Sequence, residues 1–204
     1  MRPLRILGLA LVAGLLAASG SASAQTPDTA PGFTLTDTNG NTHRLIDYRG
    51  KTVVLEWLNY DCPFVRKHYA TGNMQRLQAT YTGRDVVWLA VVSSAPGEQG
   101  YFSATEMNRR TREQNGRATA VLLDPTGQVG RAYGARTTPH MYVINPQGQI
   151  VYNGAIDDRP TSAQADVEGA RNYVSEALEA VLSGRPVPTA RTQPYGCSVK
   201  YAAS

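Results

Sequence analysis

The sequence predicts an α/β fold in which a central mixed β-sheet is flanked by helices on both faces. Short apolar runs alternate along the chain with longer segments whose apolar residues recur at helical spacing. Strands separated by helices in this way form parallel units. Near the end of the series, two apolar runs are joined by the turn Asn145-Pro146-Gln147-Gly148, which is typical of an antiparallel hairpin. Parallel units and a hairpin together give a mixed sheet.

The first half of the chain supplies an entry hairpin and the first strand-helix unit. Residues 33–36 alternate like a short strand, and the turn Asn39-Gly40-Asn41 follows them. Residues 51–58 form a nearly continuous apolar run, which indicates a buried strand. Residues 63–81 then have helical spacing, and Gly72-Asn73 predicts an interruption of that helix.

The second half completes the sheet and ends in a helix. Apolar runs predict strands at 85–92 and 118–123, with a polar helix at 103–115 between them. The remaining elements are expected to be a short helix at 128–133, the hairpin strands 141–144 and 149–152, and a long helix from about 163 to 182. Beyond residue 184 the chain becomes rich in proline and threonine, which predicts an irregular tail.

The first 24 residues have the pattern of a secretory signal peptide. Two arginines precede an apolar run at 6–18, and the small residues Ala22 and Ala24 suit cleavage before Gln25. The apolar run is shorter than the roughly 20 residues that a membrane-spanning helix needs. We therefore expect a periplasmic or secreted protein without a stable membrane span, and an uncleaved anchor is the alternative interpretation.

Cleavage would leave one domain, residues 25–184, followed by a C-terminal tail, residues 185–204. The net charge would fall from +4 to +2, because the removed segment holds two arginines and no acid. The other basic residues are interspersed with acids, so Arg110 and its basic neighbours are interpreted as solvated surface. This charge is too small to indicate nucleic-acid binding.

The chain has only two cysteines, Cys62 and Cys197. Cys62 lies where a predicted strand gives way to the helix that begins at Pro63. The unpaired amide groups at a helix N-terminus stabilise a thiolate, whereas the neighbouring carboxylate of Asp61 opposes it. Cys62 is therefore a candidate for thiol chemistry, and a buried, inert cysteine is the alternative.

A family resemblance rests on several ordered segments. Residues 54–65, which contain Cys62, resemble the active-site segment of thioredoxin-fold proteins. The downstream segments are similar to those of the redoxin branch, the alkyl hydroperoxide reductase and thiol-specific antioxidant (AhpC/TSA) superfamily: Val121-Leu122-Leu123-Asp124-Pro125-Thr126-Gly127, Ala132-Tyr133-Gly134-Ala135, Thr137-Thr138-Pro139 and Val143-Ile144-Asn145-Pro146-Gln147-Gly148. The resemblance covers about residues 30 to 182 and implies a thioredoxin-like fold. It also implies a cis Thr138-Pro139 bond that lies against Cys62 and presents backbone for substrate pairing.

Two departures from the family narrow the expected activity. A thioredoxin has a second cysteine three residues after the first, and that position is Val65 here. A typical peroxiredoxin has proline and threonine or serine at seven and three residues before its reactive cysteine, and these positions are Leu55 and Asn59. The resemblance therefore implies thiol-dependent oxidoreductase activity without deciding between disulfide exchange and an antioxidant role.

Cys197 has three possible roles. As a resolving cysteine it would close a disulfide with Cys62, and Gly196 is expected to give the tail enough flexibility. As a static staple it would close a loop of 135 residues, which stabilises a fold by about 5 kcal/mol in the chain-entropy model. As an intermolecular thiol it would pair with a partner protein.

We predict Cys62 and Cys197 as catalytic residues, with a thiol or disulfide partner protein or a small oxidant as reaction partner. The expected substrate-binding residues are Thr138, Pro139, Asn59, Tyr60 and Phe64. No cofactor and no resident metal are predicted. A copper or zinc site built from the two thiols and His140 is the alternative from another class, and His68 is interpreted as solvated or helix-packing.

Overall fold

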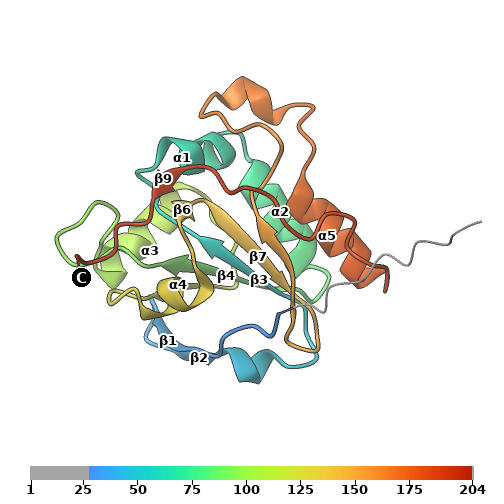
Figure 1. The fold of residues 1–204 in the computed structure, drawn as a ribbon. Helices are drawn as coiled ribbons and strands as arrows, with labels where there is room; N and C mark the ends of the chain where they lie inside the picture. Colours follow the sequence, from blue (N-terminus) through green and yellow to red (C-terminus); the bar gives the residue numbers. More distant parts are fainter. Residues whose placement is uncertain (1–27, 204) are drawn as a thin grey trace, which may run out of the picture.

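The structure, a computed structural model, describes residues 28–203, and its centre is a seven-stranded mixed sheet (Figure 1). The order across the sheet is β2-β1-β5-β4-β3-β7-β8. These strands are β1 (Thr34–Asp37), β2 (Thr42–Arg44), β3 (Val53–Trp57), β4 (Val87–Val92), β5 (Ala120–Leu123), β7 (His140–Ile144) and β8 (Ile150–Gly154). A separate two-stranded pair joins β6 (Thr137–Thr138) to β9 (Cys197–Ser198).

The directions of the strands confirm the predicted mixed sheet. Strands β3, β4 and β5 are parallel, as expected for strands connected through helices. The hairpin of β7 and β8 is antiparallel and pairs with β3, whereas the entry hairpin of β1 and β2 pairs with β5. The carboxyl end of β3, next to the start of β7, is the edge at which Cys62 follows.

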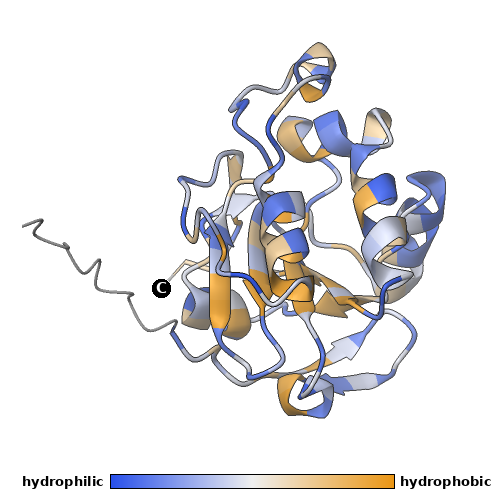
Figure 2. Ribbon diagram, turned by 90° about the vertical axis from the view of Figure 1, so that its right-hand side faces the viewer, coloured by the Kyte–Doolittle hydropathy of each residue, from blue (hydrophilic) through white to orange (hydrophobic). Residues whose placement is uncertain are grey.

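Helices cover both faces of the sheet, and the apolar residues gather in the strands and on the helix sides that face them (Figure 2). The helical elements are η1 (Leu45–Tyr48), α1 (Pro63–Ala70), α2 (Asn73–Thr82), α3 (Ala104–Glu113), α4 (Gln128–Tyr133), η2 (Gln164–Val167) and α5 (Tyr173–Leu182). One buried cluster joins α1, α2, α3 and α5 to the sheet. The other joins α4 and η1 to the opposite face. Alternation along β3 and the following loop places Trp57 in the second cluster and Leu58 in the first.

The interruption between α1 and α2 is confirmed, because Gly72 has a left-handed φ of 70° and precedes α2. The long helix predicted from about 163 to 182 is wrong in its first half. Only a 3-10 turn forms there, and Gly169 adopts a positive φ of 71°. Helix α5 begins later, where the side chain of Asn172 accepts a hydrogen bond from the Ser175 N–H at 2.8 Å.

The C-terminal tail is ordered and packed along the domain. Its residues 190–192 run beside β8, where the Asn153 N–H donates to Ala190 O at 3.0 Å and the Thr192 N–H donates to Asn153 O at 3.1 Å. Beyond β9, the Val199 N–H donates to Arg136 O at 3.0 Å and Lys200 O accepts from the Ala95 N–H at 2.8 Å. The tail is therefore hydrogen-bonded to the domain on both sides of Gly196, and its flexibility stays a prediction.

The segment predicted as a signal peptide lies outside the described residues. Among residues 28–203, none of the helices has the length and apolar character needed to cross a membrane.

Candidate thiol active site

Cys62 caps the N-terminus of α1, as the sequence predicted. Its backbone is extended, Pro63 occupies the first turn, and the Arg66 N–H donates to Cys62 O at 2.9 Å. The loop after β3 is tightened by a hydrogen bond from the Cys62 N–H to Asn59 O at 3.0 Å. The side chain is fully buried. Its sulfur therefore lies at the positive end of the helix and is shielded from water.

The backbone of Thr138, which precedes Pro139, lies against this sulfur. The bond between them is cis, as the resemblance implied. Thr138 O is 3.0 Å from Cys62 Sγ and accepts a hydrogen bond from the thiol. The backbone of β6 thus reaches Cys62 Sγ, which is the placement that the resemblance implies for a substrate-pairing edge.

The tail brings Cys197 to the same place. Strand β9 pairs antiparallel with β6, with Cys197 opposite Thr138. The two sulfurs are 2.7 Å apart and belong to free thiols, and the Cys197 N–H donates to Cys62 Sγ at 3.4 Å. Two residues separated by 135 positions in the sequence therefore meet in one site.

Gly196 makes this approach possible. Its φ of +144° is unfavourable for other residues, and a Cβ atom built on it would lie 2.1 Å from Thr138 O. No side chain fits between the tail and β6 at this position, so a glycine is needed for β9 to reach the strand.

The Cys197 thiol keeps its proton near neutral pH, because burial, together with the contact with Cys62, raises its pKa to about 12. The Cys62 sulfur lies at the N-terminus of α1 and accepts the Cys197 N–H at 3.4 Å. The role of Cys62 as the nucleophile of the pair stays a prediction.

An ion pair neutralises the carboxylate next to Cys62. Arg110 on α3 lies with Nη1 2.8 Å from Asp61 Oδ1, and its guanidinium group stacks 3.7 Å from the centre of the Phe102 ring. Arg110 is therefore partly buried, with 24% of its side chain exposed, whereas its neighbours Arg109 and Arg112 lie on the surface as predicted. The Asp61 carboxylate next to Cys62 thus has a cationic partner.

The other predicted substrate-binding residues, Asn59, Tyr60 and Phe64, differ in how far they are buried. Asn59 is buried, and its Oδ1 accepts the Asp61 N–H at 2.9 Å. Tyr60 is also buried, packed edge-on against Tyr69. Phe64 is partly buried, with its ring 5.9 Å from that of Tyr195 in the tail. Their contact with a substrate stays a prediction, and Phe64 is the most accessible of the three.

Sequence reasoning missed a buried carboxyl group, Glu56 on β3. It is fully buried and accepts hydrogen bonds from Trp88 Nε1 at 2.8 Å, Gln78 Nε2 at 3.0 Å and the Tyr69 hydroxyl at 2.9 Å. Burial raises its pKa. An acid in the middle of the apolar run of residues 53–57 was the available signal, because such a residue needs partners to be buried.

His140 does not have a nitrogen available for a metal in this arrangement. Its Nε2 donates to Asn153 Oδ1 at 2.7 Å, and its Nδ1 accepts the Arg136 N–H at 3.3 Å. Within residues 28–203, no three side chains of the usual metal-binding types are grouped to hold an ion. His140 is buried and packs as a core residue beside Tyr142.

Acid is expected to destabilise the protein through His140. Burial lowers the pKa of this side chain from 6.5 to about 4. Between these values the unfolded chain binds a proton that the folded protein does not, so the free energy of unfolding falls as the pH falls from 6.5 to 4. His140→Gln should remove up to about 3 kcal/mol of this fall, measured by urea unfolding at several pH values. If the variant keeps the wild-type dependence of the unfolding free energy on pH, that dependence does not come from His140. Buried His68, whose pKa is also lowered to about 4, accounts for a weaker dependence that remains in the variant.

Comparisons with known proteins show the family of this chain. The model of the AhpC/TSA family matches residues 26–153. The thiol-disulfide oxidoreductase ResA of Geobacillus thermodenitrificans is 31% identical over 123 residues, which cover 60% of this chain and 64% of the relative. ResA of Bacillus subtilis is 28% identical over 133 residues, covering 65% of this chain and 69% of the relative. The chain thus spans less than two thirds of the first relative's length.

Two solved structures extend the similarity in three dimensions. An uncharacterized conserved protein from Geobacillus kaustophilus has a TM-score of 0.76 and 30% identity, covering 87% of this chain and 93% of that one. A putative thiol:disulfide interchange protein DsbE from Chlorobium tepidum has a TM-score of 0.57 and 25% identity, covering 78% of this chain and 99% of that one.

Proposed function

Because the chain belongs to the AhpC/TSA family and has a thioredoxin-like fold, we propose that it is a thiol-disulfide oxidoreductase with Cys62 as nucleophile and Cys197 as resolving cysteine. The observation that carries the proposal is the 2.7 Å contact between the two sulfurs at the N-terminus of α1. The names of the ResA relatives support the same reaction class. The signal-like pattern of residues 1–24 supports export.

The proposed reaction has two exchange steps. A Cys62 thiolate attacks one sulfur of a partner disulfide, forming a mixed disulfide and releasing the first partner thiolate, which takes up a proton. Cys197 then loses its proton to solvent and attacks Cys62 Sγ, so the mixed disulfide breaks and the second partner thiolate leaves. Two enzyme thiols are oxidised to one disulfide while one partner disulfide is reduced to two thiols. The reverse sequence oxidises a partner dithiol.

Disulfide exchange is a better match to the site than peroxide reduction. Leu55 and Asn59 occupy the positions at which a typical peroxiredoxin has its peroxide-holding residues. Leu55 is a fully buried apolar residue, and Asn59 uses its side-chain oxygen to hold the Asp61 N–H. Neither arrangement supplies the hydroxyl that would hold a peroxide and its leaving group.

The test is mass spectrometry of the wild type, Cys62→Ser and Cys197→Ser after one equivalent of a disulfide substrate and, separately, of hydrogen peroxide. The disulfide should convert the wild type to an internal Cys62–Cys197 bridge and should leave Cys197→Ser as a mixed disulfide on Cys62. Cys62→Ser should form little adduct. A wild type in which Cys62 stays a free thiol under both challenges would contradict the proposal. Faster reaction with peroxide than with disulfide would favour the antioxidant role, and resistance of the bridge to millimolar glutathione would favour the staple.

A further inference from the structure

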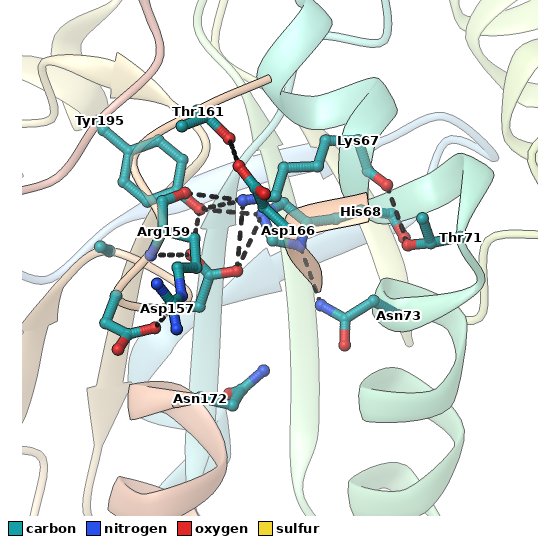
Figure 3. A network of polar contacts seen from close by, with 12 residues as sticks. Lys67, His68, Thr71, Asn73, Asp157, Arg159, Thr161, Asp166, Asn172 and Tyr195 are labelled. Atoms are coloured by element: carbon teal, nitrogen blue, oxygen red, sulfur yellow. Dashed lines mark hydrogen bonds and ion pairs between the residues drawn. The ribbon is translucent and has the colours of Figure 1, made fainter. Parts of the chain in front are cut away.

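A buried polar cluster connects the tail to the helix that carries Cys62 (Figure 3). Its members are Lys67 and His68 on α1, Asp157 after β8, and the hydroxyl group of Tyr195 in the tail. The Lys67 and His68 side chains are fully buried, and that of Asp157 is 2% exposed. Burying an amine and a carboxylate is costly unless they are paired, and here Lys67 Nζ lies 3.5 Å from Asp157 Oδ2 and donates to Arg159 O at 2.7 Å.

The hydroxyl group of Tyr195 both donates and accepts hydrogen bonds. It donates to Asp157 Oδ1, and it accepts from His68 Nε2 at 3.1 Å and from Lys67 Nζ at 3.4 Å. His68 is neutral near pH 7, because burial lowers its pKa to about 4, and its Nδ1 accepts from Asn73 Nδ2 at 2.9 Å. The Nε2–H of this tautomer therefore points at Tyr195.

Because Tyr195 is close to Cys197 in the chain, the cluster bears on where the Cys197 thiol lies relative to Cys62. Tyr195 lies two residues before Cys197, and Cys62 is the residue that caps α1. The tail is also attached to β8, to the segments before β6 and after β4, and to β6 itself through β9. The cluster adds an attachment to α1, and the Tyr195 ring also lies 5.9 Å from that of Phe64 on the same helix. It therefore connects the segment just before Cys197 to the helix whose N-terminus Cys62 caps.

We propose that Tyr195 is a positioning residue for disulfide closure: its hydroxyl group, inserted among Lys67, His68 and Asp157, holds Cys197 against Cys62. This inference rests on the proposed function, because it concerns the step in which Cys197 attacks Cys62 Sγ. Loss of the hydroxyl would leave the tail's covalent chemistry intact and would lower the fraction of time that the two sulfurs are in contact.

The experiment measures the glutathione equilibrium of the pair, in which two protein thiols and oxidised glutathione give the protein disulfide and two reduced glutathiones. Its constant is the effective concentration of Cys197 at Cys62. Tyr195→Phe keeps the ring beside Phe64 and removes only the hydroxyl. It should lower the constant about tenfold or more, since hydrogen bonds to charged groups are among the stronger ones in proteins. It should also speed alkylation of reduced Cys62 by iodoacetamide, because Cys62 is covered in the docked state.

The matched control is Tyr133→Phe. The Tyr133 hydroxyl is also part-buried and donates to a backbone carbonyl, Pro31 O, at 2.7 Å, but it lies on α4 away from Cys62. The control should leave the constant and the alkylation rate within twofold of the wild type. A Tyr195→Phe variant that does the same, or that changes both readouts no more than Tyr133→Phe, overturns the positioning role while the proposed function stands. A wild type that forms no internal disulfide at any glutathione ratio overturns both.

Discussion

Gly196→Ala is expected to lower the effective concentration of Cys197 at Cys62 about 100-fold. A Cβ atom at this position would lie 2.1 Å from Thr138 O, so β9 must move away from β6. A misplacement of about 1 Å between reacting groups is enough for an effect of this size. The glutathione equilibrium of the pair measures the loss, and the rate of closure of the Cys62 mixed disulfide should fall with it.

Gly184→Ala is the matched control for backbone strain. Gly184 also has a positive φ, +67°, but an added Cβ atom there would meet no atom within 4 Å. It should cost about 1 kcal/mol of stability and leave the glutathione equilibrium unchanged. If Gly196→Ala behaves like this control, the close approach of β9 to β6 does not govern disulfide closure.

Oxidation of the pair is expected to raise the free energy of unfolding by about 5 kcal/mol. The bridge would close a loop of 135 residues, which removes that much chain entropy from the unfolded state at 25 °C. For a domain of this size the midpoint of thermal unfolding should rise by roughly 10–20 °C. The measurement compares oxidised wild type with Cys197→Ser under the same non-reducing conditions.

The same two proteins under strong reductant provide the control. They should unfold within about 1 kcal/mol of each other, because the substitution exchanges a single sulfur for an oxygen at a part-buried position. Oxidised wild type that is no more stable than reduced wild type would show that closure strains the fold by as much as it restricts the unfolded chain.

Much of the site was predictable because its signals are local. A cysteine between an apolar strand and a proline marks the start of α1, and the Thr138-Pro139 segment stands immediately before β7. The sequence left open whether Cys197 meets Cys62 or pairs with a partner protein, because sequence does not say where a tail of 20 residues runs. Strand pairing between β6 and β9 brings the two sulfurs together, and their joining in a disulfide stays a prediction.

The parts that sequence did not predict depend on contacts between distant segments. Lys67 and Tyr195 are separated by 128 positions, and nothing in the local pattern of either one indicates the other. The apolar spacing at 163–182 predicted one continuous helix. The positive φ of Gly169 interrupts it, and the N-cap Asn172 starts α5 only at Tyr173. The sequence around Arg110 is typical of a surface helix. Only the packing of α3 beside the loop that holds Asp61 gives Arg110 its partner.

Pairing of β9 with β6 has a consequence for partner selection. The tail occupies the backbone edge beside Thr138 that the family resemblance assigns to the substrate, and Cys62 beneath it is fully buried. Under the proposed function, a protein substrate would bind this edge only after the tail has left it, and its apparent affinity would be its intrinsic affinity multiplied by the fraction of molecules without a docked tail. A weakly binding partner would then be excluded at ordinary concentrations, whereas a partner that binds the edge strongly would displace the tail. The tail thus competes with a protein substrate for the edge of β6, and its local concentration is fixed because it belongs to the same chain.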